Sequence, residues 1–240
     1  MDADRTGRLA PAAESKATLA LVRLLTLLSP AFPTGGFAYS HGLEFAVEAG
    51  DVTDASRLAE WLASMLTEGA GRNDAILLRL SHRSVRDDPS GTGLGALAGL
   101  GRAMAPAAEL ALETLQQGDA FATGAAPWVT PDLARRLRAL APLAYPVAVG
   151  AIAAALDIEA AAAVAAYLQG WTASLVSAGI RLIPLGQTAG LAVQSGLEAR
   201  IVDLVETTRA ATLDDLASAC PRADIAAMRH ETQYTRLFRS

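Results

Sequence analysis

Apolar side chains recur along most of the chain at the three- and four-residue spacing of an α-helix. Leu58, Leu62 and Met65, for example, follow Asp54, a residue type that caps helix N-termini. No stretch shows the sustained apolar–polar alternation of a β-strand, so the pattern predicts an all-α protein. The predicted helices span residues 15–28, 39–50, 54–68, 73–85, 106–118, 160–180, 187–209, 212–220 and 224–231, and two more begin at Pro131 and within residues 139–156.

Two long runs, residues 139–156 and 160–180, contain no charged residue. Each has about the length of a bilayer-spanning helix, and arginines on one flank with acidic residues on the other would suit an oriented span. Alanine dominates both runs, however, and Pro142, Pro146 and Gly150 interrupt the first. Helices that are apolar on all sides also form the centre of large helical proteins. We therefore expect a single-domain multi-helix bundle with buried Ala/Leu-rich central helices, and no membrane span.

The remaining segments divide the chain. Residues 87–101 are rich in glycine, serine and proline, and we expect a loop there. Residues 1–15 lack the basic-then-apolar order of a signal peptide, and we expect a disordered N-terminal tail. The all-α domain then covers residues 16–231, and residues 232–240 form a C-terminal interaction tail, called the tail below.

Composition narrows the function. Hydrophobic residues make up 52% of the chain and aromatic residues only 5%, which favours close-packed helices built from Ala, Leu and Val. A net charge of −5 argues against nucleic acid as a partner. Cys220 is the only cysteine, which excludes an internal disulfide and any site with several thiolate ligands. We expect a reducing, cytoplasmic location.

Familiar catalytic and metal-binding patterns are missing from the sequence. Lys16, the only lysine, lacks the glycines of a phosphate-binding loop. The three histidines, His41, His82 and His230, are scattered and form no ligand pair on one helix face. His41 and Glu44 could share a helix face as an acid–base pair, which makes a small helical hydrolase the alternative function. The simpler interpretation is a capping or tertiary hydrogen bond. We therefore expect a binding protein, not an enzyme, with no catalytic residues, no metal site and no stably bound cofactor.

Residues 29–44, SPAFPTGGFAYSHGLE, carry more aromatic and polar side chains than a connection between two helices requires. We call this segment the corner. Two prolines and a Gly-Gly pair set its path, and Tyr39, Ser40, His41 and Glu44 follow. The density of these groups predicts that the corner also presents side chains to something else.

The end of the chain, RHETQYTRLFRS (residues 229–240), interleaves aromatic residues and a leucine with arginines. Chain ends usually consist of small polar residues unless something holds them, and tyrosine and arginine are favoured interface anchors. The tail therefore packs on its own helical core, is presented to a partner, or does both.

The corner, the segment RLIPLGQTAG (residues 181–190) and the C-terminal RHETQYTRLFRS resemble, in this order, the urease accessory protein F family. The resemblance covers residues 19–240 and is weak over residues 87–131. Thr34 stands where a small aliphatic residue is commoner in the family.

The resemblance implies a non-enzymatic, all-helical homodimer. It would act in a complex with urease accessory proteins D (H in some bacteria) and G. Protein G is a nickel-carrying GTPase, and the complex delivers nickel, its cargo, to apo-urease; the present chain would be a scaffold and modulator of that GTPase. The partner-binding residues carried over by this resemblance are Tyr39, Ser40, His41, Glu44, Arg229, His230, Glu231, Tyr234, Arg236, Phe238 and Arg239. For Arg181 and Gln187 the resemblance suggests a structural or dimer role.

Overall fold

The computed structural model describes residues 9–88 and 91–240. Every regular element in this part of the chain is a helix, which confirms the all-α prediction. The α-helices are α1 (Leu9–Leu27), α2 (Leu43–Glu48), α3 (Ala55–Glu68), α4 (Ala70–Asp87), α5 (Thr92–Ala103), α6 (Ala108–Gly124), α7 (Pro131–Ala139), α8 (Tyr145–Ala155), α9 (Ala160–Leu182), α10 (Gln187–Thr207) and α11 (Pro221–His230), and the 3-10 helices are η1 (Gly36–Ala38), η2 (Ala126–Trp128) and η3 (Leu213–Asp215).

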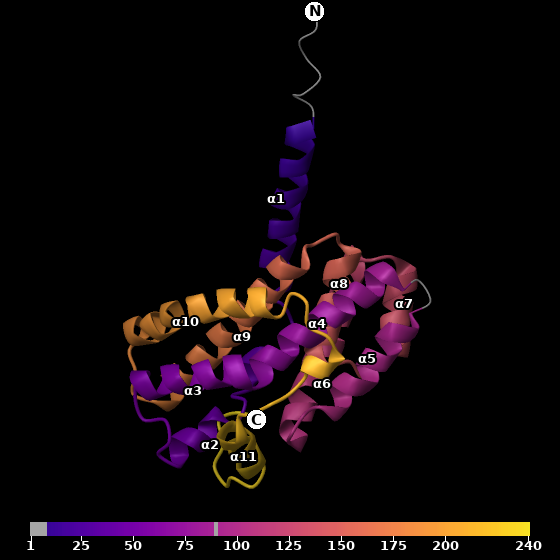
Figure 1. The fold of residues 1–240 in the computed structure, drawn as a ribbon. Helices are drawn as coiled ribbons and strands as arrows, with labels where there is room; N and C mark the ends of the chain where they lie inside the picture. Colours follow the sequence, from indigo (N-terminus) through magenta and orange to yellow (C-terminus); the bar gives the residue numbers. More distant parts are fainter. Residues whose placement is uncertain (1–8, 89–90) are drawn as a thin grey trace, which may run out of the picture.

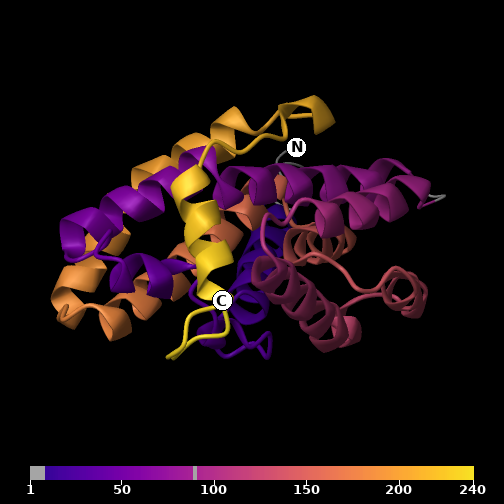
Figure 2. The same ribbon diagram turned by 90° about the horizontal axis from the view of Figure 1, so that it is seen from below.

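Helix α4 runs through the middle of the molecule and joins two groups of helices (Figure 1). On one side α3, α9 and α10 pack against one another, and on the other side α8 packs on α4 together with α5 and α6. Helices α2 and α11 lie side by side although they come from opposite ends of the chain (Figure 2). This last pairing brings the corner and the tail together.

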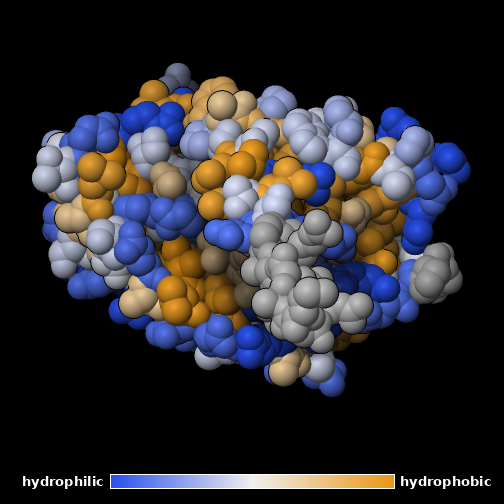
Figure 3. Space-filling view, turned by 90° about the horizontal axis from the view of Figure 1, so that it is seen from above, coloured by the Kyte–Doolittle hydropathy of each residue, from blue (hydrophilic) through white to orange (hydrophobic). Residues whose placement is uncertain are grey.

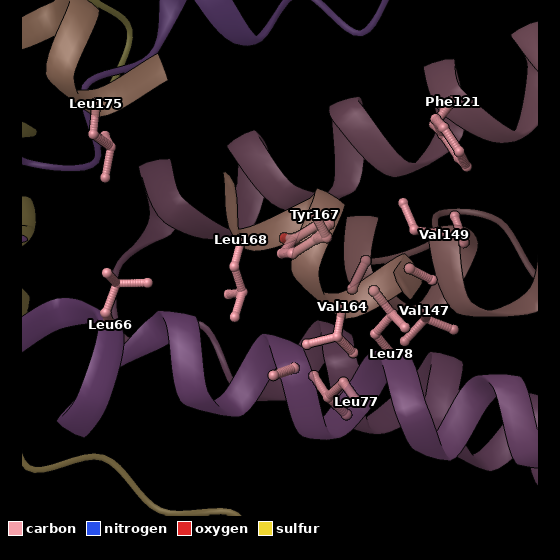
Figure 4. Packing of buried hydrophobic residues seen from close by; sticks show 14 of the residues in the cluster. Leu66, Leu77, Leu78, Phe121, Val147, Val149, Val164, Tyr167, Leu168 and Leu175 are labelled. Atoms are coloured by element: carbon pink, nitrogen blue, oxygen red, sulfur yellow. The ribbon is translucent and has the colours of Figure 1, made fainter. Parts of the chain in front are cut away.

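The two uncharged runs form the buried centre, as predicted. Every residue of α8 from Pro146 to Ala154 is buried, and Val147 of α8 and Val164 of α9 lie near Leu77 and Leu78 of α4 in the same buried cluster (Figure 4). Among the described residues, no helix is both long and apolar enough to cross a membrane. The apolar character of these helices is thus accounted for by packing against protein.

Two predicted helix starts are confirmed by their capping hydrogen bonds. The Asp54 carboxylate accepts a hydrogen bond from the Arg57 backbone N–H at 3.0 Å, and the Thr130 hydroxyl accepts one from the Leu133 N–H at 3.3 Å. In both cases a side-chain oxygen satisfies a backbone donor that has no partner within the helix.

The loop predicted over residues 87–101 is wrong for most of its length, because α5 begins at Thr92. Leu94, Leu97, Ala98 and Gly101 are buried along one face of this helix. Their three- and four-residue spacing is the signal that the glycine content obscured. Residues 89–90 lie outside the described part.

Helix α1 begins at Leu9, earlier than the predicted start at Ser15; residues 1–8 of the predicted tail lie outside the described part. The helix projects from the body (Figure 1). Among the residues of α1 whose side chains are described, only Leu24 and Leu27 are buried, whereas Leu21 and Leu25 are 55% and 65% exposed. On the surface from which α1 projects, apolar patches alternate with hydrophilic ones (Figure 3).

Helix α2, in contrast, starts later than predicted, at Leu43, because Gly42 just before it adopts a left-handed backbone with φ 77°. A Cβ atom at Gly42 would lie 2.7 Å from the backbone nitrogen of Ala227 in α11. Glycine is therefore needed both for the turn and for the close approach of α11. Near the other end of the chain, the helix predicted over residues 212–220 is reduced to η3, and α11 starts at Pro221.

Candidate partner interface at the corner and the tail

The last residues of the tail run alongside the corner. The Arg239 N–H donates a hydrogen bond to the Ala38 carbonyl at 2.8 Å, and the Ser40 N–H donates one to the Ser240 carbonyl at 2.8 Å. The Ser40 hydroxyl donates to the same Ser240 carbonyl, and the Ser240 hydroxyl donates to Glu113 of α6 at 2.6 Å. The tail is therefore held by directional bonds to its own body.

Glu44, in the first turn of α2, is the centre of this junction. One carboxylate oxygen accepts the Leu237 N–H at 2.7 Å, and the other accepts the Phe238 N–H at 2.9 Å. The second oxygen also lies 3.2 Å from Nε2 of His230. Glu44 is only 5% exposed, and such burial of a carboxylate requires several hydrogen-bond donors of this kind.

His230, the last residue of α11, is fully buried between two carboxylates. Its Nε2 faces Glu44, and its Nδ1 lies 2.5 Å from Oε2 of Glu109 in α6. The other oxygen of Glu109 accepts a hydrogen bond from Nη1 of Arg236 at 2.5 Å. Helix α2, helix α6, helix α11 and the tail are thus joined through one network of charged groups.

His41 does not form the suggested pair with Glu44. It precedes α2 with a left-handed backbone, φ 56°, and its Nδ1 lies 3.4 Å from Oε2 of Glu113. Burial acts to lower the pKa of His41, but the nearby carboxylates of Glu113, Asp74 and Asp224 together outweigh it, so the pKa is raised. The alternative function as a hydrolase thus loses its proposed acid–base pair, because His41 faces Glu113 whereas Glu44 faces His230.

Contacts between exposed arginines and aromatic rings also join the corner to the tail. The Arg181 guanidinium lies 4.2 Å from the centre of the Phe238 ring and donates a hydrogen bond to the Phe37 carbonyl at 3.1 Å. The Arg239 guanidinium lies 5.5 Å from the centre of the Tyr39 ring. Such contacts contribute about 0.5–1 kcal/mol each at exposed sites. Arg181 therefore has the structural role that was expected for it, whereas Gln187 is exposed at the start of α10.

Between the buried His230 of α11 and the buried Phe238 of the tail, the chain forms an exposed loop. Tyr234 is fully exposed and Leu237 is 75% exposed, whereas Phe238 is buried. The Glu231 carboxylate accepts the Ala108 N–H at 2.7 Å and so caps the start of α6. The tail therefore packs on the body through its last residues while its middle is exposed to solvent, and its presentation to a partner stays a prediction.

A cavity of about 120 Å³ lies beside His41 and is lined by side chains of α4, α6 and α11, including Asp74, Thr114 and Asp224. Burial raises the pKa of Asp74 to about 6, although the Tyr167 hydroxyl, which donates to it at 2.6 Å, acts in the opposite direction. In the described residues, no group of three or more His, Cys, Asp or Glu side chains is arranged to hold a metal ion.

Comparison with known proteins places this architecture in a family. The UreF family model matches residues 52–198. The urease accessory protein UreF of Methylorubrum populi is 50% identical over 223 residues, covering 91% of this chain and 98% of the relative. UreF of Bradyrhizobium sp. strain BTAi1 is 48% identical over 92% of both chains, and UreF of strain ORS 278 is 45% identical over the full length of both. This chain belongs to the UreF family.

The UreF relatives are named as accessory proteins of urease and not as enzymes, in line with the expected binding role. The region matched by the family model includes α3 to α9 but neither the corner nor the tail. The relatives, in contrast, align over nearly the whole chain.

The structure gives most of the predicted site residues of this UreF-family chain an internal partner. Tyr39, Ser40, Glu44, His230 and Phe238 are buried at the junction, and contact with a partner protein would reach them only if the tail moved. The exposed members of the predicted set are Arg229, Glu231, Tyr234, Arg236 and Arg239. Partner binding by any of them stays a prediction.

Glu109 and Glu113 are the junction residues that the sequence reasoning missed. Both lie in α6, within the region of weak resemblance, and they are four residues apart on its packed face next to the buried Leu110 and Gln117. Two carboxylates on the apolar face of an amphipathic helix indicate, from the sequence alone, that polar partners lie opposite that face, because buried carboxylates need such partners.

Proposed function

We propose that this chain is a scaffold in the maturation of urease. It assembles, as a homodimer, with urease accessory proteins D/H and G in the cytoplasm, modulates the GTPase cycle of protein G, and so supports delivery of nickel to apo-urease. Nickel is the cargo of the complex and not a resident cofactor. Membership of the UreF family carries this proposal, because the relatives are named as urease accessory proteins.

The loop of the tail is the proposed docking element. Its two ends are fixed by His230 and Phe238, and between them Tyr234 and Leu237 project into solvent. Fixed ends reduce the conformational entropy that binding would cost. An aromatic ring and a leucine in a rim of arginines have the composition of an interface anchor.

The arginines of the tail are also held in place. Arg236 is paired with Glu109, and Arg239 lies over Tyr39. Arginines supplied in trans stabilise the transition state of GTP hydrolysis in other GTPases, so a held arginine at the edge of the docking loop is a means by which this scaffold would act on protein G.

Co-purification of the full chain with accessory proteins D/H and G tests the proposal. We expect the Tyr234→Ala/Leu237→Ala double variant to bind at least about tenfold more weakly. The matched control is Leu191→Ala/Val202→Ala, which truncates two exposed apolar side chains of α10 and should bind like the wild type.

Two outcomes separate the parts of the proposal. If the wild-type chain binds neither accessory protein, the scaffold function is wrong. If the wild type binds and the tail variant binds equally well, the docking role of the loop is wrong while the scaffold function stands. GTP turnover by protein G, measured with Arg236→Ala and Arg239→Ala, checks the proposed modulation.

A further inference from the structure

The hydrogen-bonding environment of the His230 ring is unusual. Both of its ring nitrogens face carboxylate oxygens, those of Glu44 and Glu109. A carboxylate that is ionised only accepts hydrogen bonds, and a neutral imidazole carries a single N–H donor. The two contacts are therefore both hydrogen bonds only when the ring carries two protons and a positive charge.

The neighbouring groups agree with a charged ring. Glu44 accepts two backbone N–H groups and Glu109 accepts Arg236, so both carboxylates are placed to be ionised. With a neutral ring, the two carboxylates would face only the Arg236 guanidinium as a counter-charge. Protonation of His230 makes this buried cluster electrically balanced, and an unbalanced charge is costly where water is excluded.

The remaining charged groups around His230 point elsewhere. Glu113, one turn further along α6, faces His41 and Ser240. Glu48, one turn further along α2, accepts a hydrogen bond from Gln233. Glu231, next in the chain, caps α6. Arg229 is exposed on α11.

We propose that His230 is a protonation-dependent latch for the tail. The doubly protonated ring joins α11 to Glu44, and Glu44 in turn holds the backbone of Leu237 and Phe238. As the pH rises and the ring loses one proton, one carboxylate loses its hydrogen bond and the cluster gains net negative charge. The contact of Leu237 and Phe238 with Glu44 then loosens, while residues 239 and 240 stay bonded to the corner and to α6 and the helical core stays folded. This inference goes beyond the proposed function and does not depend on the partners named there.

Hydrogen exchange of the Leu237 and Phe238 amides, followed by NMR in the full chain from about pH 6 to about pH 9, tests the latch. After correction for the intrinsic pH dependence of exchange, we expect protection of both amides to fall at least about tenfold. The Leu133 amide, bonded to Thr130 far from the tail, should keep its protection.

Histidine variants identify the group responsible. His230→Gln should abolish the pH dependence of the two tail amides, whereas His41→Gln, at the other histidine near the tail, should preserve it. If His230→Gln fails to fold, the ring nitrogens of the wild type can be followed by ¹⁵N NMR. A ring that stays neutral while the tail amides change, or tail amides that do not respond to pH, would overturn the proposal.

Discussion

The centre of the molecule and the corner–tail junction are both buried, but they are held together differently. Around α8 the packed side chains are Ala, Val, Leu and Ile, and helices approach closely because small residues allow it. At the junction, carboxylates, a histidine and backbone amides satisfy one another. The stability of the centre depends on how closely side chains fill the space between helices. The stability of the junction depends on whether each polar group has a hydrogen-bond partner. We therefore expect the centre to unfold cooperatively with the whole protein and the junction to open locally.

The largest expected effect comes from adding one methyl group to the centre. A Cβ atom at Gly150 of α8 would lie 2.2 Å from the carbonyl oxygen of Leu78 in α4. Because that neighbour is backbone, the two helices must separate, and Gly150→Ala should lower the free energy of unfolding by about 3 kcal/mol or more. Denaturant unfolding measures this loss.

The matched control is Gly196→Ala, in the middle of α10, where nothing lies within 4 Å of the added Cβ. This change should stabilise the protein by about 0.5–1 kcal/mol, because alanine favours the helix. Equal effects of the two substitutions would show that helix propensity, and not close packing at α8, determines the outcome.

A second prediction concerns Asp74, a half-buried carboxyl group between the centre and the junction. Its pKa is about 6 in the folded chain, against 3.8 for an unperturbed Asp. Between these pH values the folded state binds more protons than the unfolded state, so stability falls as the pH rises. Asp74→Asn removes this term and keeps an acceptor for Tyr167. It should be more stable near neutral pH by about 2–3 kcal/mol.

Unfolding curves collected from about pH 4 to about pH 7 test this sign. Asp54→Asn is the control, because the backbone N–H of Arg57 lowers the pKa of Asp54, and its removal should change the slope in the opposite sense. Parallel curves for the wild type and Asp74→Asn would contradict the assignment.

The sequence predicted the centre well because its determinants are local. The absence of charge over residues 139–156 and 160–180, and the caps at Asp54 and Thr130, can be read without knowing what they pack against. The error at α5 had a different cause. Glycine lowers helix propensity, but burial of Leu94 and Leu97 supplied the missing stability.

The junction could be predicted only in part, because its partners are far apart in the sequence. The corner and the tail were both recognised as unusual, yet nothing in either segment indicates that Glu44 accepts the amides of residues 237 and 238, or that His230 faces Glu109. Local spacing instead suggested a pair of His41 and Glu44. The backbone turn at His41 and Gly42, both with positive φ, separates these two side chains.

The smallest expected effect is also the most local. In Glu44→Gln, an amide NH₂ replaces one of the two carboxylate oxygens, so a donor faces either the Leu237 N–H or the donors of Phe238 and His230. An unsatisfied buried donor costs about 1–3 kcal/mol. Because this cost falls on the contact between tail and corner, amide exchange of Leu237 and Phe238 should accelerate while the global unfolding midpoint changes little. Glu60→Gln, at an exposed position of α3 away from the tail, should leave both measurements unchanged. A lowered global midpoint in Glu44→Gln would mean that the junction and the centre unfold as one unit, which the difference in their packing argues against.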